Sequence, residues 1–410
     1  MKKILFILYT CCILLFPVSA QQIPSFKAND RIVFLGNSIT EGGHYHSYIW
    51  LYYMTHFPEL PLRIYNGGIG GDCASHMVFR FDSDIKIKKP TYLVCSFGMN
   101  DSGYDGYNKP GYDKYANKQV EYANTEFGKL QQQILADKKI KNVVLLGSSP
   151  YDENVKLEGV ETLHGKNETI KRIIEMQAEV AQKRGWGFVN FNTVMCELNK
   201  EIQQSDSTAT FCGGDRIHPD KDGHMVMAYL FLKAQGLAGK EVAYFHINAT
   251  NRKAMEERNC RITHIKNEND TISFSYLSRS LPFPVDTIPR WGTKGTARDA
   301  VRQVPFMQEM NQEIMKVTDL HGNFRVTIDG TEIGRWDGNE LSKGINLAEI
   351  TCTPQYQQSL SIMYLNEERC AIEKRLRQYM AMQYVFFKHR GLLFADNKAA
   401  LDAAKAERES

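Results

Sequence analysis

The sequence of 410 residues lacks the features that mark several large classes of protein. It has no run rich in lysine and arginine, and its formal net charge of +3 is small for this length, so nucleic acid is not implied as a partner. Beyond the first twenty residues no stretch is apolar enough to span a bilayer, so we expect no stable membrane insertion. With 43% apolar and 24% charged residues, the composition instead indicates an ordinary soluble globular protein.

Cysteine patterns that mark a disulfide framework or a zinc site are also missing. Seven cysteines follow residue 20, an odd number at irregular spacing and without a Cys-x-x-Cys pair. Cys196 with Cys212 is the first pair that we would test for a disulfide. His44 and His46 lie close together, but two histidines without a third ligand favour surface or substrate-rim residues over a metal site.

The first twenty residues have the composition of an export signal. Lys2 and Lys3 precede an apolar stretch over residues 4–18, and a Val-Ser-Ala sequence at 18–20 is typical of a cleavage site. The apolar stretch is too short to favour a retained transmembrane helix. We therefore expect a mature chain that begins near Gln21 and is periplasmic or secreted.

Short apolar runs alternate with longer amphipathic stretches from residue 31 to about residue 236. This alternation predicts a parallel sheet covered by helices on both faces, and five runs fit a flavodoxin-like three-layer α/β/α domain with a five-stranded sheet. The expected strands lie at residues 32–35, 62–65, 92–97, 143–146 and 188–191, and the expected helices at residues 47–57, 74–87, 112–136, 164–184, 193–204 and 221–234.

The chain after residue 236 follows a different pattern. Residues 271–276 and 324–328 alternate as half-buried strands. Asp329-Gly330 then predicts a hairpin turn into a strand over residues 331–336. We expect three parts of the chain, namely a signal peptide over residues 1–20, an α/β domain over 21–238 and a smaller C-terminal α+β extension over 239–410.

A long helix is expected near the end of the chain. Thr353 would cap it and Pro354 would be its first residue, and the helical pattern continues to about residue 388. Seven apolar residues predict one stripe that packs on the α/β domain or on the hairpin, and they are Leu360, Met363, Tyr364, Ile372, Leu376, Tyr379 and Met380. Neither the role of the extension nor the oligomeric state follows from the sequence.

The turn after the first expected strand presents a serine. Gly36 ends the apolar run, and Ser38 follows it at a position that projects a hydroxyl above the edge of the sheet. The pattern Gly-x-Ser is weak by itself, because a serine beside a helix start is usually only an N-cap. The segments that follow the other strands decide between these two interpretations.

Ligands of such sheets bind beyond the carboxyl ends of the strands. A glycine-rich loop at residues 66–72 follows the second strand, Gly98-Met99-Asn100-Asp101 follows the third, and a loop ending in Asp215-Arg216-Ile217-His218 follows the last. Each of these segments taken alone could serve a turn or a helix cap. Their common place on one rim favours a catalytic site.

These residues meet the requirements of acyl transfer by serine. Ser38 would supply the hydroxyl, His218 would accept its proton through one imidazole nitrogen, and Asp215 would orient the ring through the other. An oxyanion would meet the backbone N–H groups of Ser38 and Gly71 and the side chain of Asn100. An amide suits that last position because it donates without titrating.

As a set, four segments resemble the conserved blocks of the SGNH hydrolases, also called GDSL esterases and lipases. They are Gly36-Asn37-Ser38-Ile39, Gly70-Gly71-Asp72, Gly98-Met99-Asn100-Asp101 and Asp215-Arg216-Ile217-His218, in matching order over residues 30–236. The resemblance implies hydrolysis of esters or thioesters without a cofactor, with Ser38 as nucleophile, Gly71 and Asn100 in the oxyanion hole, and Asp215 and His218 as acid and base. Asn37 stands where the family usually has Asp, which leaves the local pKa tuning open.

The sequence says less about the substrate. Tyr104, Tyr107, Tyr112 and Tyr115 follow the third strand, and aromatic faces with few aliphatic neighbours suit sugar rings. Exported members of the family frequently remove acetyl groups from polysaccharides, so the resemblance favours a carbohydrate acetylesterase. Tyr104, Tyr107 and His44 are the expected substrate contacts, although a tyrosine-rich loop is often only packing.

Two alternatives remain beside an esterase that acts on an acylated carbohydrate or another small ester. A lipase or lysophospholipase would need an apolar acyl groove, which a sequence cannot show. A non-catalytic carbohydrate-binding protein on an esterase fold is the other alternative. The intact set of Ser38, Gly71, Asn100, Asp215 and His218 speaks against it.

Overall fold

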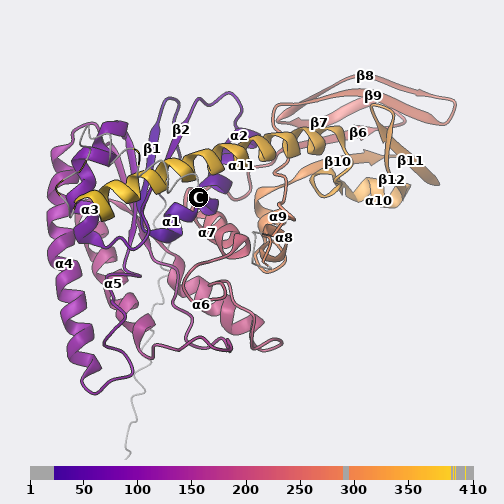
Figure 1. Ribbon diagram of the computed structural model, residues 1–410. Helices are drawn as coiled ribbons and strands as arrows, with labels where there is room; N and C mark the ends of the chain where they lie inside the picture. The colour runs from indigo at the N-terminus through magenta and orange to yellow at the C-terminus, as the bar shows by residue number, and fades with distance from the viewer. Residues whose placement is uncertain (1–22, 290–294, 389–390, 392, 394–401, 403–410) are drawn as a thin grey trace, which may run out of the picture.

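The computed structural model describes residues 23–289, 295–388, 391, 393 and 402. The expected signal peptide over residues 1–20 lies outside these ranges. Figure 1 shows an α/β part at one side of the molecule, a β-rich part at the other, and one long helix that runs along both. Within the described ranges, no helix combines the length and the apolar character needed to cross a membrane.

A five-stranded parallel sheet forms the centre of the first half of the chain. Neighbouring strands pair in the order β2-β1-β3-β4-β5, and every pair is parallel. The strands are β1 (Arg31–Gly36), β2 (Arg63–Gly68), β3 (Tyr92–Phe97), β4 (Asn142–Gly147) and β5 (Gly187–Asn190). This order is that of flavodoxin-like sheets, so the expected fold class is confirmed.

Helices cover both faces of this sheet. The run 32–35 of β1 is fully buried, and its side chains alternate between two hydrophobic cores, as the period of a strand requires. One core is closed by α2 (His44–His56), α6 (Phe191–Ile202) and α7 (Lys221–Ala234), the other by α3 (Ala74–Arg80) and α4 (Tyr112–Ala136), and α5 (Lys166–Arg184) contributes to both.

The helix expected over residues 74–87 is interrupted. Helix α3 ends at Arg80 and continues as a π-helical turn, Phe81–Ile85, and a 3-10 turn, Lys86–Lys88. A π-turn shifts the following side chains relative to a regular helix, and such turns are frequent at functional sites. Here it places Asp84 with both its oxygens in a buried cluster of cations, described below.

The second half of the chain forms the expected smaller α+β extension. A four-stranded sheet in the order β13-β10-β6-β7 packs with two hairpins, β8-β9 and β11-β12, around a separate hydrophobic core. Asp329 and Gly330 both have positive φ, 48° and 83°, in the predicted hairpin turn. The strands are β6 (Ala243–Asn248), β7 (Lys253–Arg258), β8 (Cys260–Glu268), β9 (Thr271–Ser278), β10 (Glu313–Thr318), β11 (Asn323–Ile328), β12 (Thr331–Asp337) and β13 (Ile345–Asn346).

Residues 281–289 and 295–310, which lie between β9 and β10, pack into the α/β half. They include α8 (Ala297–Ala300) and α9 (Phe306–Met310). Phe283 and Phe306 lie in contact, with ring centroids 5.0 Å apart, and both belong to the same hydrophobic core as β1 and α2. The extension therefore completes the core of the α/β half as well as forming its own.

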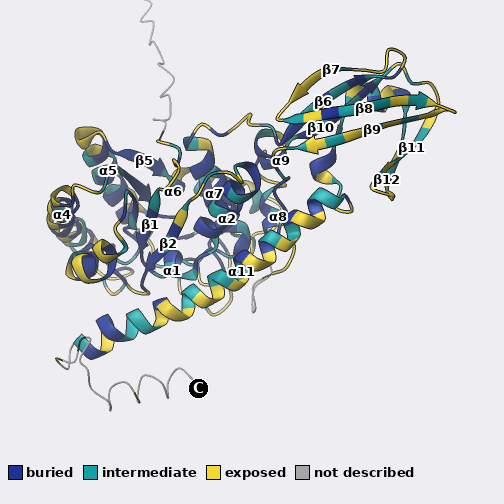
Figure 2. Ribbon diagram, turned by 90° about the horizontal axis from the view of Figure 1, so that it is seen from above, coloured by how far each residue is buried: buried dark blue, intermediate teal, exposed yellow. Residues whose placement is uncertain are grey.

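Helix α11 (Pro354–Ala381) has Pro354 as its first residue and Thr353 as its cap, as predicted. Figure 2 shows it lying along the α/β half with one exposed side. The predicted apolar stripe is confirmed only in part. Met363 is 3% exposed and packs with Leu360 on the core of the α/β half, whereas Tyr364, Ile372 and Leu376 are 51%, 56% and 57% exposed. The buried face also carries polar side chains such as Asn366, whose amide donates to the carbonyl and the hydroxyl of Ser47. The physical reason is that farther along α11 the helix covers polar backbone groups of β2, which need donors and acceptors rather than apolar contacts.

Cys196 and Cys212, the pair to be tested first for a disulfide, are not bonded to each other. Both are free thiols, as are the other five cysteines of the described ranges. The Asn167 amide donates to the sulfur of Cys196 and the Asn199 amide donates to the sulfur of Cys212, each at 3.4 Å. Each sulfur thus faces an amide of a helix instead of the other sulfur.

Glu313 is a carboxyl buried where β9, β10 and α11 meet. One of its oxygens accepts hydrogen bonds from the Tyr276 hydroxyl at 2.7 Å and the Gln355 amide at 3.0 Å. The other oxygen has no hydrogen-bond partner among the described residues. Burial outweighs these hydrogen bonds and raises the pKa of Glu313 from 4.5 to about 7.

We expect Glu313→Gln to stabilise the protein at pH 8. The folded state holds a proton on Glu313 up to about pH 7 and the unfolded state only up to about 4.5, so stability falls as pH rises through that window. An amide has no charge to bury, and the variant should gain roughly 1–3 kcal/mol above the window. Thermal unfolding between pH 5 and 8 measures the difference, with Glu368→Gln on the exposed side of α11 as the control. Equal pH slopes in wild type and Glu313→Gln would contradict this expectation.

Candidate active site

The turn after β1 is held by a cap at Asn37. Helix α1 (Ser38–Gly42) starts directly after it, and the Asn37 side-chain oxygen accepts a hydrogen bond from the Ile39 N–H at 3.0 Å. Asn37 is 2% exposed, so a charged carboxylate here would be buried. The amide fills the cap without that charge, and the departure from the usual Asp leaves the turn intact.

Ser38, His218 and Asp215 form a chain of short contacts. The Ser38 Oγ lies 2.7 Å from Nε2 of His218, a residue 180 positions away in the sequence. The other ring nitrogen, Nδ1, lies 2.5 Å from the Asp215 carboxylate. Because a carboxylate only accepts, Nδ1 carries the proton and Nε2 is free to accept from the serine hydroxyl.

The surroundings of Asp215 keep its carboxyl ionised. Partial burial raises its pKa, but hydrogen bonds from the side chain and the backbone of His218 and from the backbone of Ile217 lower the pKa below the ordinary value of 3.8. The carboxylate therefore stays charged at neutral pH and holds the imidazole in one tautomer.

Arg216 anchors the turn that carries Asp215 and His218. It is 3% exposed, has φ of 69°, and donates to the backbone carbonyls of Asp152, Val155 and Val160. Gly213 precedes the turn with φ of 72°, and a Cβ there would lie 1.9 Å from the His218 carbonyl oxygen. Sequence reasoning missed Arg216, for which the one signal was its place between the two polar residues.

The loop after β2 supplies Gly71 in a left-handed conformation, with φ of 78°. No atom lies within 4 Å of a Cβ built there, so the conformation rather than the space favours glycine. The preceding N–H, of Gly70, donates to the Glu41 carboxylate at 2.6 Å and ties the loop to α1. Within the described ranges the N–H groups of Gly71 and Ser38 donate to no protein acceptor.

Asn100, in the loop after β3, is held at both ends of its amide. Its nitrogen donates to the Asp72 carbonyl at 3.0 Å, and its oxygen accepts from the Tyr104 hydroxyl at 2.8 Å. The amide cannot flip without breaking both contacts, and one N–H remains for a ligand. Tyr104, expected to touch substrate, thus orients the expected oxyanion donor.

Lys166 supports this arrangement from within the protein. Its ammonium lies 3.7 Å from the centre of the Tyr104 ring, and burial lowers its pKa to about 7. It donates to three oxygens of the loop after β3, those of the Met99 carbonyl, the Ser102 hydroxyl and the Gly103 carbonyl. Sequence reasoning missed Lys166, because nothing in the sequence marks a lysine in α5 as buried.

Of the other two expected substrate contacts, Tyr107 is buried, and the contact of His44 stays a prediction. Tyr107 is 2% exposed and its hydroxyl donates to the Ser102 carbonyl, so it belongs to the packing of its own loop and the expected substrate contact is wrong. His44 is at the start of α2 with its Nδ1 3.9 Å from Glu367 of α11. His46 is fully buried against Phe34, and burial lowers its pKa to about 4, which corrects the expectation of a surface or rim residue.

Groups that could hold a metal ion are not found in the described part of the chain, where no three His, Cys, Asp or Glu side chains gather suitably. The groups that the structure brings together at the rim are the serine hydroxyl, the imidazole and the carboxylate. A serine presented after β1, a glycine after β2, an asparagine after β3 and a histidine in the loop before α7 define an SGNH-type serine hydrolase.

Comparison with known proteins gives the family. The family described as GDSL-like Lipase/Acylhydrolase matches residues 34–226, and the family described as Diltiazem deacetylase C-terminal helical domain matches residues 360–410. The solved structure of a gut microbial diltiazem-metabolizing enzyme is 49% identical, with 95% of this chain and 88% of that chain covered and a TM-score of 0.91. The chain therefore belongs to the GDSL-like lipase/acylhydrolase family and is an ester hydrolase.

A more distant relative covers about half of the chain. An acetylxylan esterase of Geobacillus stearothermophilus is 22% identical over 224 residues, which are 51% of this chain and 95% of that protein. Its solved structure is 21% identical, covers 51% of this chain and 95% of that one, and has a TM-score of 0.39. This relative has no counterpart to the other half of the chain.

We expect Asn100→Ala to lower kcat about 10²–10³-fold with little change in KM. Its free N–H would meet a negative charge that exists in the transition state and not in the substrate. Tyr104→Phe leaves the donor in place but frees the amide to turn, so its loss should be about 3–10-fold, the scale of one neutral hydrogen bond.

Both variants are compared with Tyr107→Phe, which loses a hydroxyl bound to the backbone of the same loop. The values of kcat, KM and the melting temperature are measured on the same preparations. An Asn100→Ala protein with wild-type kcat and a lowered melting temperature would make Asn100 a turn cap and would remove it from the site.

Proposed function

We propose that this protein hydrolyses acetyl esters through an acyl-enzyme formed on Ser38. The observation that carries the proposal is the chain from the Ser38 hydroxyl through both nitrogens of His218 to the ionised Asp215. A retired esterase fold that only binds carbohydrate would have no reason to hold these three groups in hydrogen-bond contact, so the geometry disfavours that alternative.

In the first half of the reaction His218 accepts the Ser38 proton at Nε2 while Oγ attacks the ester carbonyl. The carbonyl oxygen takes up the electron pair and becomes an oxyanion, which the N–H groups of Ser38, Gly71 and Asn100 meet. The carbonyl then reforms, the C–O bond to the alcohol breaks, and His218 returns its proton to the leaving oxygen. The alcohol departs and the acetyl group remains on Ser38.

In the second half water takes the place of the alcohol. His218 accepts a proton from the water as it attacks the acetyl-serine, the same donors meet the second oxyanion, and the Ser38 oxygen leaves with the proton. The net reaction consumes one ester and one water and gives the alcohol and acetic acid, which ionises to acetate and a proton at neutral pH. Asp215 stays ionised throughout and balances the charge on the imidazolium.

The choice of an acetyl group rests on the names of the relatives. The family matched over residues 360–410 is described as part of a diltiazem deacetylase, and the relative from Geobacillus stearothermophilus is an acetylxylan esterase. We propose an acetylated carbohydrate as the substrate from the second of these, and a diltiazem-like drug ester is the competing candidate from the first. Export from the cytoplasm stays a prediction.

We expect p-nitrophenyl acetate to be hydrolysed faster than the butyrate and the octanoate, and Ser38→Ala to abolish the activity. Loss of the nucleophile removes the acyl-enzyme path and should lower kcat at least about 10³-fold. Activity that rises with chain length would favour the lipase alternative instead. Acetate release from acetylated xylooligosaccharides and from diltiazem, measured side by side, decides the class of alcohol.

The pH dependence tests the base. His218 must be neutral to accept a proton, so kcat/KM should rise with pH through one ionisation and then level off. The pKa of Asp215 is lowered, so this carboxylate is already ionised over the same range and adds no second step. Asp215→Asn should lower kcat about 10²–10⁴-fold, because an amide can hold the wrong tautomer. A flat profile from pH 5 to 8, with chemistry limiting the rate, would contradict the role of His218.

A further inference from the structure

Helix α11 covers the open edge of the central sheet at its carboxyl end. Strand β2 is the edge strand of the sheet. The Asn66 N–H and the Gly68 C=O point away from β1, toward α11. The Asn66 N–H donates to the carboxylate of Glu373 at 2.7 Å, and the Gly68 carbonyl accepts from Nε of Arg377 at 2.9 Å. Glu373 and Arg377, one helical turn apart, thus make hydrogen bonds that a further strand would otherwise make at this edge.

Arg377 also binds a buried carboxylate. Its two terminal nitrogens donate to the two oxygens of Asp84 at 2.8 and 2.7 Å, across a separation of 293 residues. Arg377 is 3% exposed and Asp84 is fully buried. A bidentate pair of this kind fixes both the position and the orientation of the guanidinium.

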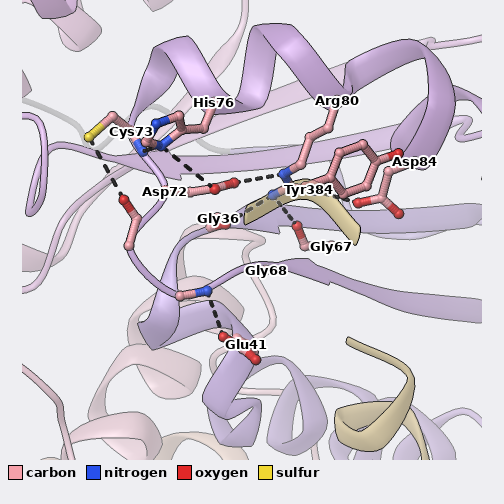
Figure 3. A network of polar contacts seen from close by, with 12 residues as sticks. Gly36, Glu41, Gly67, Gly68, Asp72, Cys73, His76, Arg80, Asp84 and Tyr384 are labelled. Atoms are coloured by element: carbon pink, nitrogen blue, oxygen red, sulfur yellow. Dashed lines mark hydrogen bonds and ion pairs between the residues drawn. The ribbon is translucent and has the colours of Figure 1, made fainter. Parts of the chain in front are cut away.

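Asp84 is shared with a second arginine that touches the active-site strands. Figure 3 shows Arg80 between Asp84 and Asp72, with contacts at 2.5 and 2.7 Å. The same guanidinium donates to the carbonyls of Gly36 and Gly67 at 3.2 and 2.7 Å. Gly36 ends β1 two residues before the serine, and Asp72 directly follows the glycine of the expected oxyanion hole.

The charges of this cluster depend on one another. Burial raises the pKa of Asp84, but hydrogen bonds and charges from Arg377, Lys88 and Arg80 lower it well below its ordinary value. Without Arg377, the carboxylate would lose its bidentate partner and the Gly68 carbonyl would lose its donor. Asp84 would then shift, and with it Arg80, whose guanidinium donates to carbonyls at the ends of β1 and β2.

We propose that Arg377 is a positioning residue for the oxyanion hole, supplied by the C-terminal helix, so that the site is complete only with α11 in place. The proposal rests on the function proposed above for Ser38 and Gly71. Arg377 acts on Gly68 directly and on Asp72 through Asp84 and Arg80, and these residues flank the loop that carries the Gly71 N–H. A small displacement of that N–H weakens binding of the transition state more than binding of the substrate.

The test is Arg377→Met, which keeps the apolar stem of the side chain and removes the guanidinium. We expect kcat to fall about 10–100-fold with KM within about twofold of wild type, since misplaced donors cost rate rather than substrate affinity. A boronic acid that adopts the tetrahedral form on Ser38 should lose affinity by the same factor as kcat/KM. Arg375→Met, exposed on the same helix, is the matched control and should equal wild type in all three values.

Stability is separated from positioning in two ways. Rates are divided by the number of active sites, counted with a fluorophosphonate that labels Ser38 to completion, and are measured well below each melting temperature. Arg377→Gln and Arg377→Lys each keep one donor for the Gly68 carbonyl and should show a smaller loss of the same kind. They carry the test if Arg377→Met does not fold.

Two outcomes overturn different claims. If all folded variants match wild type in kcat per site and in boronic acid affinity, with only a lower melting temperature, α11 is merely structural and this proposal is wrong. If wild-type hydrolysis does not depend on Ser38, the proposed function is wrong and the proposal about Arg377 falls with it. Ser38-dependent hydrolysis that ignores Arg377 rejects the positioning role alone.

Discussion

The catalytic edge of this protein depends on one buried guanidinium, that of Arg80. It donates to carbonyls at the ends of β1 and β2 and to two carboxylates, and it is 1% exposed. The Gly36 carbonyl also accepts from the Ile69 N–H at 3.1 Å. A polar group that is buried at the end of a sheet without a partner costs about 1–3 kcal/mol. A planar group with five donors satisfies several such groups together and so fixes the distance between the two loops.

Two sides of the protein converge on the expected oxyanion hole. From one side, α11 and the cluster of Arg80, Asp84 and Arg377 hold the loop after β2. From the other, Lys166 and Tyr104 hold the amide of Asn100, which in turn donates to the carbonyl of Asp72 in the loop after β2. The expected donors are therefore held in place by contacts from α11, α3, α5 and the loop after β3. Donors that are already in position need little reorganisation when negative charge develops.

The C-terminal extension supports the active site through hydrophobic packing and through charged side chains. Its Phe283 and Phe306 complete a hydrophobic core of the α/β half. Helix α11 meets the sheet edge with Glu373 and Arg377, and its Asn366 bonds Ser47 of α2. The apolar positions of α11 predicted its buried face only in part, at Leu360 and Met363. A hydrophobic pattern identifies a buried face only where the partner surface is apolar, and beside Glu373 and Arg377 the partner surface is the backbone of β2.

The sequence by itself determined the strand–helix alternation, the five-stranded flavodoxin-like sheet, the hairpin at Asp329-Gly330 and the segments that end each strand, because local periodicity and turn chemistry act over a few residues. It also brought Ser38, Asn100 and His218 to one edge, since parallel strands share their carboxyl end. Only the tertiary structure decided that Tyr107 and His46 are buried and that Cys196 and Cys212 stay apart. The same holds for the side chains that support the site, which are Tyr104, Lys166, Arg80 and Arg377. Those roles arise from contacts across tens to hundreds of residues, where a polar side chain is placed by the unpaired backbone group or charge it meets, and no local pattern records that partner.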